Sequence, residues 1–101
     1  MTTLNLGNLA TFRLVVQRGS FSAAADALGI SQPAVSLQVR QLEQFLQTRL
    51  LERTGRGIKA TAAGIALLAH SEQIELAVGA AVQSVSEFNR EISGSVTLGS
   101  G

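Results

Sequence analysis

A chain of 101 residues can bury one modest hydrophobic core but not two. It has no cysteine, which excludes disulfide bonds and thiolate chemistry, and no apolar run longer than five residues, so no membrane-spanning segment is predicted. The net charge of +1 hides an asymmetry, because residues 1–60 carry seven basic and three acidic side chains, whereas residues 61–101 carry one and four. The first part can approach a polyanion, and the second would be repelled by one.

The first predicted helix starts at an asparagine cap, either Asn5 or Asn8, and ends at Gly19, a residue suited to a helix C-terminus. Its apolar residues recur at helical spacing and are expected to face the core: Leu9, Phe12 and Val16, with Leu6 and Val15 beside them. Ser20 and Phe21 form a connector, and the Phe21 ring is expected to fill part of the core.

Two further helices are predicted over residues 22–28 and 31–47. Ser22 is the expected N-cap of the first, an alanine-rich segment. Ser31 is the expected N-cap of the second, and Pro33 falls in its first turn, where a missing N–H costs nothing.

The spacing of Ala25, Gly29 and Val35 is typical of a helix-turn-helix. A small residue lets two helices cross closely, a glycine permits the tight turn, and a branched apolar residue seats the second helix on the first. In such a unit the second helix lies in the DNA major groove, with its N-terminal residues near base edges. These residues alone leave an ordinary helical hairpin open as an alternative.

The second of these helices has two distinct faces. The apolar face is expected to lie on the core and contains Val35, Val39, Leu42 and Leu46. The opposite face is mostly polar and contains Pro33, Ser36, Leu37, Arg40 and Gln44. Leu37 on this face is either an apolar base reader, which would favour a thymine methyl, or an ordinary exposed leucine.

A small β-hairpin is predicted next, with strands at residues 50–53 and 58–60 around the glycine-rich turn 54–57. Beside a helix-turn-helix such a hairpin is a wing, and a solvated surface loop is the alternative. Its basic side chains are Arg53, Arg56 and Lys59. Arg56 stands between two glycines, which let the backbone approach DNA closely, and is the best candidate for insertion into a groove.

A long helix is predicted from the cap Thr61 to about Ile92, with apolar or small residues at heptad spacing. One column is Gly64, Ser71, Val78, Val85 and Ile92, and the other is Leu67, Ile74, Ala81 and Phe88. A helix of this length exceeds what a small core can cover, so the seam predicts pairing with a second copy of the chain. Burial within the chain is the alternative. The glycines and serines after residue 92 are expected to end the helix, and residues 96–98 alternate like the first strand of a further domain.

Several stretches that cover most of residues 4–64 carry a family resemblance: GSFSAAADALGISQPAVS, QVRQLEQFL, LLERTGRGIKAT and AAG. They resemble the N-terminal DNA-binding domain and linker helix of the LysR-type bacterial transcriptional regulators. The predicted long helix matches the family's linker in length and pattern more than in residues. The last stretch, GSVTLGSG, looks like the opening strand of the family's effector-binding domain.

The resemblance implies a mostly α-helical winged helix-turn-helix, with a three-helix core and a β-hairpin wing, followed by a long dimerisation helix. The implied domains are residues 1–61 for DNA binding, 62–92 for the linker and 93–101 for the start of a truncated effector-binding domain. Such a protein binds an interrupted inverted repeat near promoters as a dimer or tetramer and regulates transcription. It would act in the bacterial cytoplasm, associated with the nucleoid and not with a membrane, and RNA polymerase is a further expected partner. No metal or cofactor is expected in this chain, because a small-molecule effector would bind the absent C-terminal domain.

Site residues follow from the resemblance together with the exposed helix face. The expected base contacts are Gln32, Pro33, Ser36, Leu37 and Arg40, and Ser36 can also hold a phosphate. The expected phosphate contacts are Ser22, Ser31, Arg53 and Lys59, and Arg56 is expected to enter the minor groove. The expected dimer contacts are Leu67, Ile74, Val78, Ala81, Val85 and Phe88.

The chain departs from the family pattern at four positions. Leu37 stands where the family often has a polar base reader, so its sequence preference differs. Gln47 replaces a common glycine, and the recognition helix is therefore expected to end differently or to run on. Leu51 takes the place of a usual phenylalanine in the wing, and Ala62 that of a usual proline at the start of the linker.

Two other functions are alternatives to a DNA-binding regulator. An enzyme is disfavoured, because the only histidine, His70, lies in mid-helix with no cysteine nucleophile, metal-ligand cluster or phosphate loop beside it. His70 is expected to be a solvated or interface residue. The stronger alternative is an interaction module, a helical dimeriser whose basic half binds a protein. Salt-sensitive binding to one preferred DNA fragment would distinguish a regulator from such an adaptor.

Overall fold

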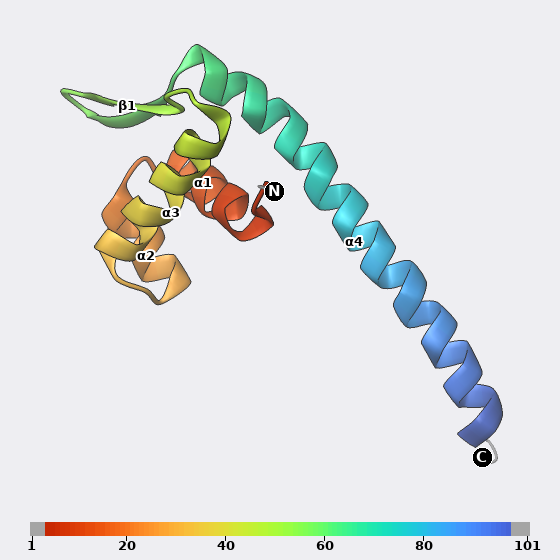
Figure 1. Ribbon diagram of the computed structural model, residues 1–101. Helices are drawn as coiled ribbons and strands as arrows, with labels where there is room; N and C mark the ends of the chain where they lie inside the picture. Colours follow the sequence, from red (N-terminus) through yellow and green to blue (C-terminus); the bar gives the residue numbers. More distant parts are fainter. Residues whose placement is uncertain (1–3, 98–101) are drawn as a thin grey trace. The chain divides into compact units, whose positions relative to one another are not determined.

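The computed structural model describes residues 4–97 and is mostly helical, with one β-hairpin (Figure 1). The elements in chain order are α1 (Leu6–Arg18), α2 (Phe21–Leu28), α3 (Gln32–Leu46), β1 (Leu51–Thr54), β2 (Gly57–Ala60) and α4 (Ala62–Thr97). The first three helices pack on one another, and the hairpin contacts α1 through β2. This arrangement confirms the predicted three-helix core, wing and long helix.

Side-chain caps set the starts of the first helices. Asn5 is the N-cap of α1, because its Oδ1 accepts a hydrogen bond from the backbone N–H of Asn8 at 2.9 Å. The predicted start of α2 at Ser22 is wrong. Ser20 is the N-cap, with its Oγ accepting from the N–H of Ala23 at 3.1 Å. The earlier start also gains a backbone hydrogen bond from Ala24 to Ser20, so the helix includes Phe21.

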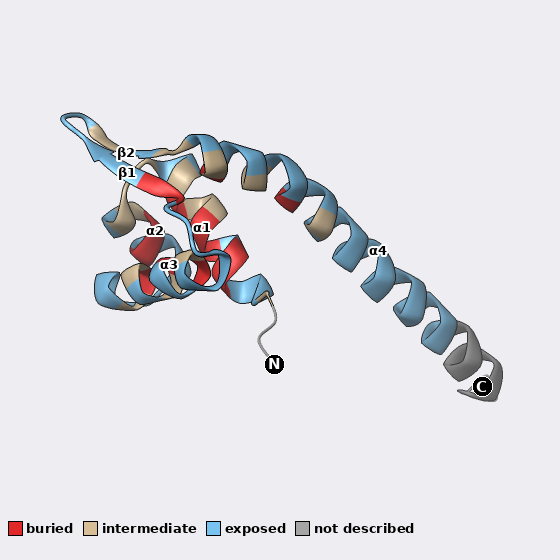
Figure 2. Cartoon of the chain, turned by 45° about the horizontal axis from the view of Figure 1, so that its top comes forward, coloured by how far each residue is buried: buried red, intermediate tan, exposed pale blue. Residues whose placement is uncertain are grey.

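The core lies where the three helices meet and is closed by the residues that follow α3 (Figure 2). Its buried apolar side chains are Leu9, Phe12, Val15, Ala24, Ala25, Val35, Val39, Leu42, Leu50 and Leu51. Four predictions of core residues are wrong. Leu6 and Leu46 are exposed, and Val16 and Phe21 are only half-buried, while Val15 completes the α1 face.

The exposure of Leu46 has a cause in the backbone that follows it. The chain turns at Gln47, a non-glycine residue in the left-handed region with φ 55°. It then brings Leu50 and Leu51 into the core in place of Leu46. The expectation that α3 would end differently or run on without a glycine here is therefore wrong, because Gln47 adopts the conformation a glycine would have.

Buried polar groups fix α1 against α3, a contact that the sequence did not indicate. Asn8 donates from Nδ2 to Oε1 of Gln41 at 3.3 Å, and the Thr11 hydroxyl donates to Oε1 of Gln38. Asn8 and Thr11 are both buried, so these bonds satisfy groups that would otherwise be costly to remove from water.

Helix α4 begins as predicted and ends later than predicted. The Thr61 hydroxyl accepts from the N–H of Gly64 at 3.0 Å, a side-chain N-cap. The helix continues past Ile92 to Thr97, so the predicted end near residue 93 is wrong, and Val96 and Thr97 are helical rather than extended. Glycine and serine weaken a helix without terminating it, and no proline stands there to force an end. The rest of the predicted strand lies outside the described residues.

The described chain divides into two compact units, with the boundary inside α4 between Ser71 and Glu72. The segment Ala62–Arg90 is long and apolar enough to cross a membrane by length and composition alone. Polar residues interrupt this segment, so that no apolar run in it exceeds five residues, without making it polar overall. One such helix is weak evidence for a membrane protein, and its heptad spacing is typical of a helix that pairs with another helix.

Candidate nucleic-acid interface

The N-terminal half of α3 presents an open, mostly polar stripe. Gln32, Pro33 and Arg40 are exposed, Ser36 is half-buried, and the Leu37 side chain remains 51% exposed. Val35 and Val39 on the opposite side are buried in the core and hold the helix in place. All five residues predicted to contact bases are therefore on the free side of α3, although Ser36 is partly covered.

Two predicted phosphate contacts lie at helix starts. Ser31 is the N-cap of α3, and its Oγ accepts from the N–H of Ala34 at 3.2 Å. This bond uses an oxygen lone pair and leaves the hydroxyl hydrogen available for an acceptor such as a phosphate. Ser22 is exposed in the first turn of α2. Because helix N-termini favour anions, both positions suit a phosphate.

The wing is a tight antiparallel hairpin with Arg56 at its tip. Thr54 pairs with Gly57, so only Gly55 and Arg56 form the connection. The Thr54 hydroxyl accepts from the N–H of Arg56 and donates to the carbonyl of Gly57, each at 3.2 Å. The Arg56 side chain is exposed. The structure thus holds the backbone of the tip and leaves the predicted groove residue free.

The other two wing cations lie on opposite faces of the hairpin. Successive side chains of a strand alternate, and Leu51 is buried, so Arg53 shares the inner face. Glu52 and Lys59 are paired across the strands on the outer face, with Nζ of Lys59 4.0 Å from the Glu52 carboxylate. The structure therefore places Arg53 and Lys59, both predicted to contact phosphates, on different faces of the wing.

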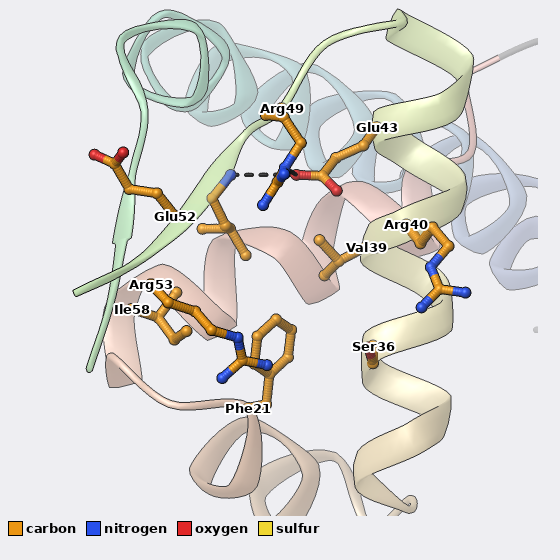
Figure 3. Close-up of a pocket in the computed structure, with 10 residues that line it drawn as sticks. Phe21, Ser36, Val39, Arg40, Glu43, Arg49, Glu52, Arg53 and Ile58 are labelled. Carbon is orange, nitrogen blue, oxygen red and sulfur yellow. Dashed lines mark hydrogen bonds and ion pairs between the residues drawn. The ribbon is translucent and has the colours of Figure 1, made fainter. Parts of the chain in front are cut away.

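An open cavity of about 320 Å³ lies between α3 and the inner face of the wing (Figure 3). Its charged lining consists of three arginines, Arg40, Arg49 and Arg53, and two glutamates, Glu43 and Glu52, and Ser36 lies beside them. Figure 3 shows Arg49 beside the Glu43 carboxylate and the Arg53 guanidinium against the ring of Phe21. Arginine side chains are the residues best suited to phosphate oxygens, so this surface can accept an anionic backbone.

Glu43 ties the recognition helix to the wing and is a residue that sequence reasoning missed. Its Oε2 accepts from the backbone N–H of Leu50 at 2.8 Å and of Leu51 at 3.3 Å, and lies 3.9 Å from Nε of Arg49. Leu50 and Leu51 are buried, so their amides depend on this carboxylate. The sequence does show a glutamate at the edge of the apolar face of α3. Its partners, however, follow the turn at Gln47, and helical spacing does not predict which residues that turn brings to Glu43.

We expect Glu43→Ala to lower the free energy of unfolding by about 2 kcal/mol, because two amides lose a charged acceptor. Glu43→Gln is the matched control, since its carbonyl oxygen retains one acceptor, and it should cost less than half as much. Urea unfolding of both variants at one protein concentration measures the difference. Equal stability of the alanine variant and the parent would show that water replaces the carboxylate without cost.

The predicted dimer residues of α4 are open to different extents within the single chain. Leu67 and Ile74 are half-buried and Ala81 is exposed. Val78, Val85 and Phe88 are 41%, 60% and 62% exposed. Gly64 and Ser71, which the sequence analysis placed in the same seam, are buried by the chain itself, so for these two turns the alternative of intramolecular burial is correct. His70 is exposed.

Comparison with known proteins gives related sequences and structures. The chain is 39% identical over 95 residues to an uncharacterized HTH-type transcriptional regulator from the ibpB-leuC intergenic region of Azotobacter vinelandii, which covers 94% of this chain and 66% of the relative. It is similar to the DNA-binding domain of BenM in complex with benA site 1 DNA, at 34% identity and a TM-score of 0.78 over 83% of this chain and 98% of that one. It is also similar to full-length CbnR in complex with its target DNA, at 40% identity and a TM-score of 0.72 over 81% of this chain and 29% of that one.

The chain thus spans 66% of the length of the Azotobacter relative and 29% of CbnR. The sequence profile described as bacterial regulatory helix-turn-helix protein, lysR family, matches residues 6–65, which include all three core helices and the wing. Because that match covers more than half of the chain, the protein belongs to the LysR family of bacterial helix-turn-helix regulators.

Proposed function

We propose that this chain binds double-stranded DNA sequence-specifically and regulates transcription. The observation that carries the proposal is the open stripe of α3 from Gln32 to Arg40, which lies beside an arginine-bearing wing. BenM and CbnR, which share this fold, are described in complex with DNA. A helix-turn-helix reads bases with the N-terminal half of its second helix, and here that half is the part left free by the core.

The distribution of charge supports the same assignment. The basic excess falls in residues 1–60, which form the three-helix core and the wing, and the acidic excess falls in α4 and beyond. A DNA-binding surface needs cations near phosphates, whereas a helix that pairs with another copy does not. Family membership favours a regulator over an enzyme.

We also propose how copies of the protein assemble on DNA. Paired α4 helices would set two recognition helices on an interrupted inverted repeat near a promoter, and longer forms of the protein would assemble into tetramers and contact RNA polymerase. Residues 93–101 would lead into an effector-binding domain, which would hold the small-molecule ligand. The protein would act in the bacterial cytoplasm at the nucleoid.

Selection of duplexes from a random DNA pool tests the proposal directly. We expect enrichment of one half-site motif, present twice as an inverted repeat, and binding that weakens steeply with salt. Failure to enrich any motif, with no gel shift at low salt, would reject DNA binding and favour the adaptor.

Replacement of Leu37 should change one base preference. An exposed leucine can favour a thymine methyl, whereas arginine can make a bidentate hydrogen bond to guanine. Leu37→Arg should therefore move the preference at a single position from T towards G by about 1–3 kcal/mol. Phe45→Arg, which adds the same charge at an exposed position in the last turns of α3, should leave every preference unchanged. Identical selected motifs for the parent and Leu37→Arg would show that residue 37 reads no base.

Replacement of Arg56 should weaken binding without changing the motif. The side chain projects from the wing tip, where it can reach phosphates and the minor groove. Arg56→Ala should reduce the slope of log affinity against log salt by roughly 0.9 per half-site, the loss of about one phosphate contact. Arg90→Ala, the same change on the exposed surface of α4, should leave the slope as it is. If Arg56→Ala changed neither the affinity nor the slope of log affinity against log salt, the wing tip would not contact DNA.

A further inference from the structure

The inner face of the wing places a cation over an aromatic ring. Cζ of Arg53 lies 5.7 Å from the centroid of the Phe21 ring, within the range of a cation–π contact (Figure 3). Phe21 is the first residue of α2 and Arg53 lies in β1, so the contact joins the start of the helix-turn-helix to the wing. Because α2 begins at Phe21, with Ser20 as its N-cap, the helix and not a connecting segment holds the Phe21 ring beside Arg53.

The surroundings of Arg53 indicate what this contact is for. Phe21 and Arg53 line both the cavity that contains Ser36 and a neighbouring cavity of about 280 Å³ that contains Ser22 and Gln32. Arg53 therefore lines two neighbouring hollows of the predicted DNA-binding surface, one of which includes residues from the starts of α2 and α3. Arg56, at the tip of the hairpin, lines neither of these two cavities.

Arg53 has an aromatic contact but, among the described residues, no ion pair. Within the described residues, Arg49 and Lys59 have carboxylates within 4.0 Å, whereas Arg53 has no such partner. A free arginine side chain loses rotamer entropy when it binds a phosphate, and a guanidinium already resting on a ring loses less. A ring face also leaves the edge N–H groups of the guanidinium open to a ligand, whereas a carboxylate would occupy them.

We propose that Phe21 is a positioning residue, which holds the Arg53 guanidinium ready for a phosphate of the DNA backbone. This inference rests on the proposed DNA-binding function. It adds that the wing also binds the phosphate backbone, outside the groove that Arg56 enters. Phe21 acts through Arg53 and makes no contact with DNA of its own in this mechanism.

A double-mutant cycle on DNA affinity tests the proposal, with Phe21→Leu, Arg53→Gln and the double variant in the full chain. The probe is the duplex selected by the parent, followed by fluorescence anisotropy over a range of salt concentrations. Phe21→Leu should weaken binding by about threefold per half-site and leave the salt slope unchanged, because the phosphate contact still forms from a less ordered side chain. Arg53→Gln should weaken it by about tenfold and lower the slope by roughly 0.9 per half-site. The double variant should bind like Arg53→Gln alone.

A variant that keeps the shape of the side chain guards against loss of folding. Pentafluorophenylalanine at position 21 reverses the charge distribution of the ring face with little change in size, so it should reproduce the affinity loss of Phe21→Leu, whereas Phe21→Tyr should bind like the parent. Additive losses in the cycle, or full affinity for the fluorinated variant, would overturn the positioning role. A parent that binds no duplex at all would instead overturn the proposed function, so the two failures are distinguishable.

Discussion

Gly64→Ala is expected to lower the free energy of unfolding by about 3 kcal/mol, at the upper end of overpacking effects. A Cβ at this position would lie 2.2 Å from the carbonyl oxygen of Leu50 and 3.1 Å from Cβ of Ala60. The first of these atoms belongs to the backbone and cannot rotate away. For a domain of this size such a loss lowers the unfolding temperature by roughly 15 °C.

The contact is rigid because Leu50 is held from both sides. Its carbonyl accepts from the N–H of Thr61 at 2.9 Å, and its own N–H donates to the Glu43 carboxylate at 2.8 Å. The Thr61 hydroxyl also donates to the carbonyl of Arg49 at 2.7 Å. Relief of the clash would therefore break bonds that join α3, the wing and the start of α4, so strain at Gly64 cannot relax locally.

Gly79→Ala is the matched control in the same helix. An added Cβ at Gly79 would meet nothing within 4 Å, and the residue lies beside the heptad seam rather than in it. Alanine is a better helix former by up to about 1 kcal/mol, so this variant should be no less stable than the parent. Urea unfolding at one protein concentration measures both, since association contributes to the stability of a dimer. If the two variants had the same free energy of unfolding, Gly64 would not be closely packed.

We expect the parent chain to sediment as a dimer, and the double variant Val78→Glu with Val85→Glu to sediment as a monomer at the same concentration. Both valines are open in the single chain and lie seven residues apart in one heptad column. A paired helix would bury them, with about 1.5–3 kcal/mol for each side chain, whereas glutamates would bring four like charges into the seam. Glutamate is at least as good a helix former as valine, so loss of α4 would not explain dissociation.

Leu76→Glu with Gln83→Glu is the control for this experiment. These exposed residues have the same seven-residue spacing but lie on the opposite side of the heptad, so their double variant should remain dimeric. If both double variants sediment like the parent, the seam is not the interface. If both are monomeric, the added charge rather than the seam is responsible.

The periodicity of the sequence determined the type and order of the elements, because caps, glycines and apolar spacing act within a few residues of one another. Ser31 and Pro33 start the recognition helix, Gly19 ends α1, and the glycine-rich turn makes the wing, all as predicted. The free stripe of α3 was also predictable, since it is the face opposite the buried valines Val35 and Val39. Local signals sufficed for these features.

Tertiary structure decided which residues meet across a turn or between elements, because such contacts join positions whose spacing carries no signal. Because the chain turns at Gln47, Leu50 lies in the core and Leu46 is exposed. The same turn places the backbone N–H groups of Leu50 and Leu51 within hydrogen-bond distance of the Glu43 carboxylate. Packing of the hairpin against α1 through β2 brought Arg53 over the Phe21 ring and left Lys59 on the other face.

The heptad column of α4 shows both what the sequence determines and what the tertiary structure decides. Its spacing is uniform in the sequence, yet Gly64 and Ser71 are buried by their own chain, while Val78 and Val85 are open. Periodicity determined which side of the helix is apolar. Only the fold decided which residues of that side the chain itself buries, because burial depends on what packs against a residue and not on its spacing in the sequence.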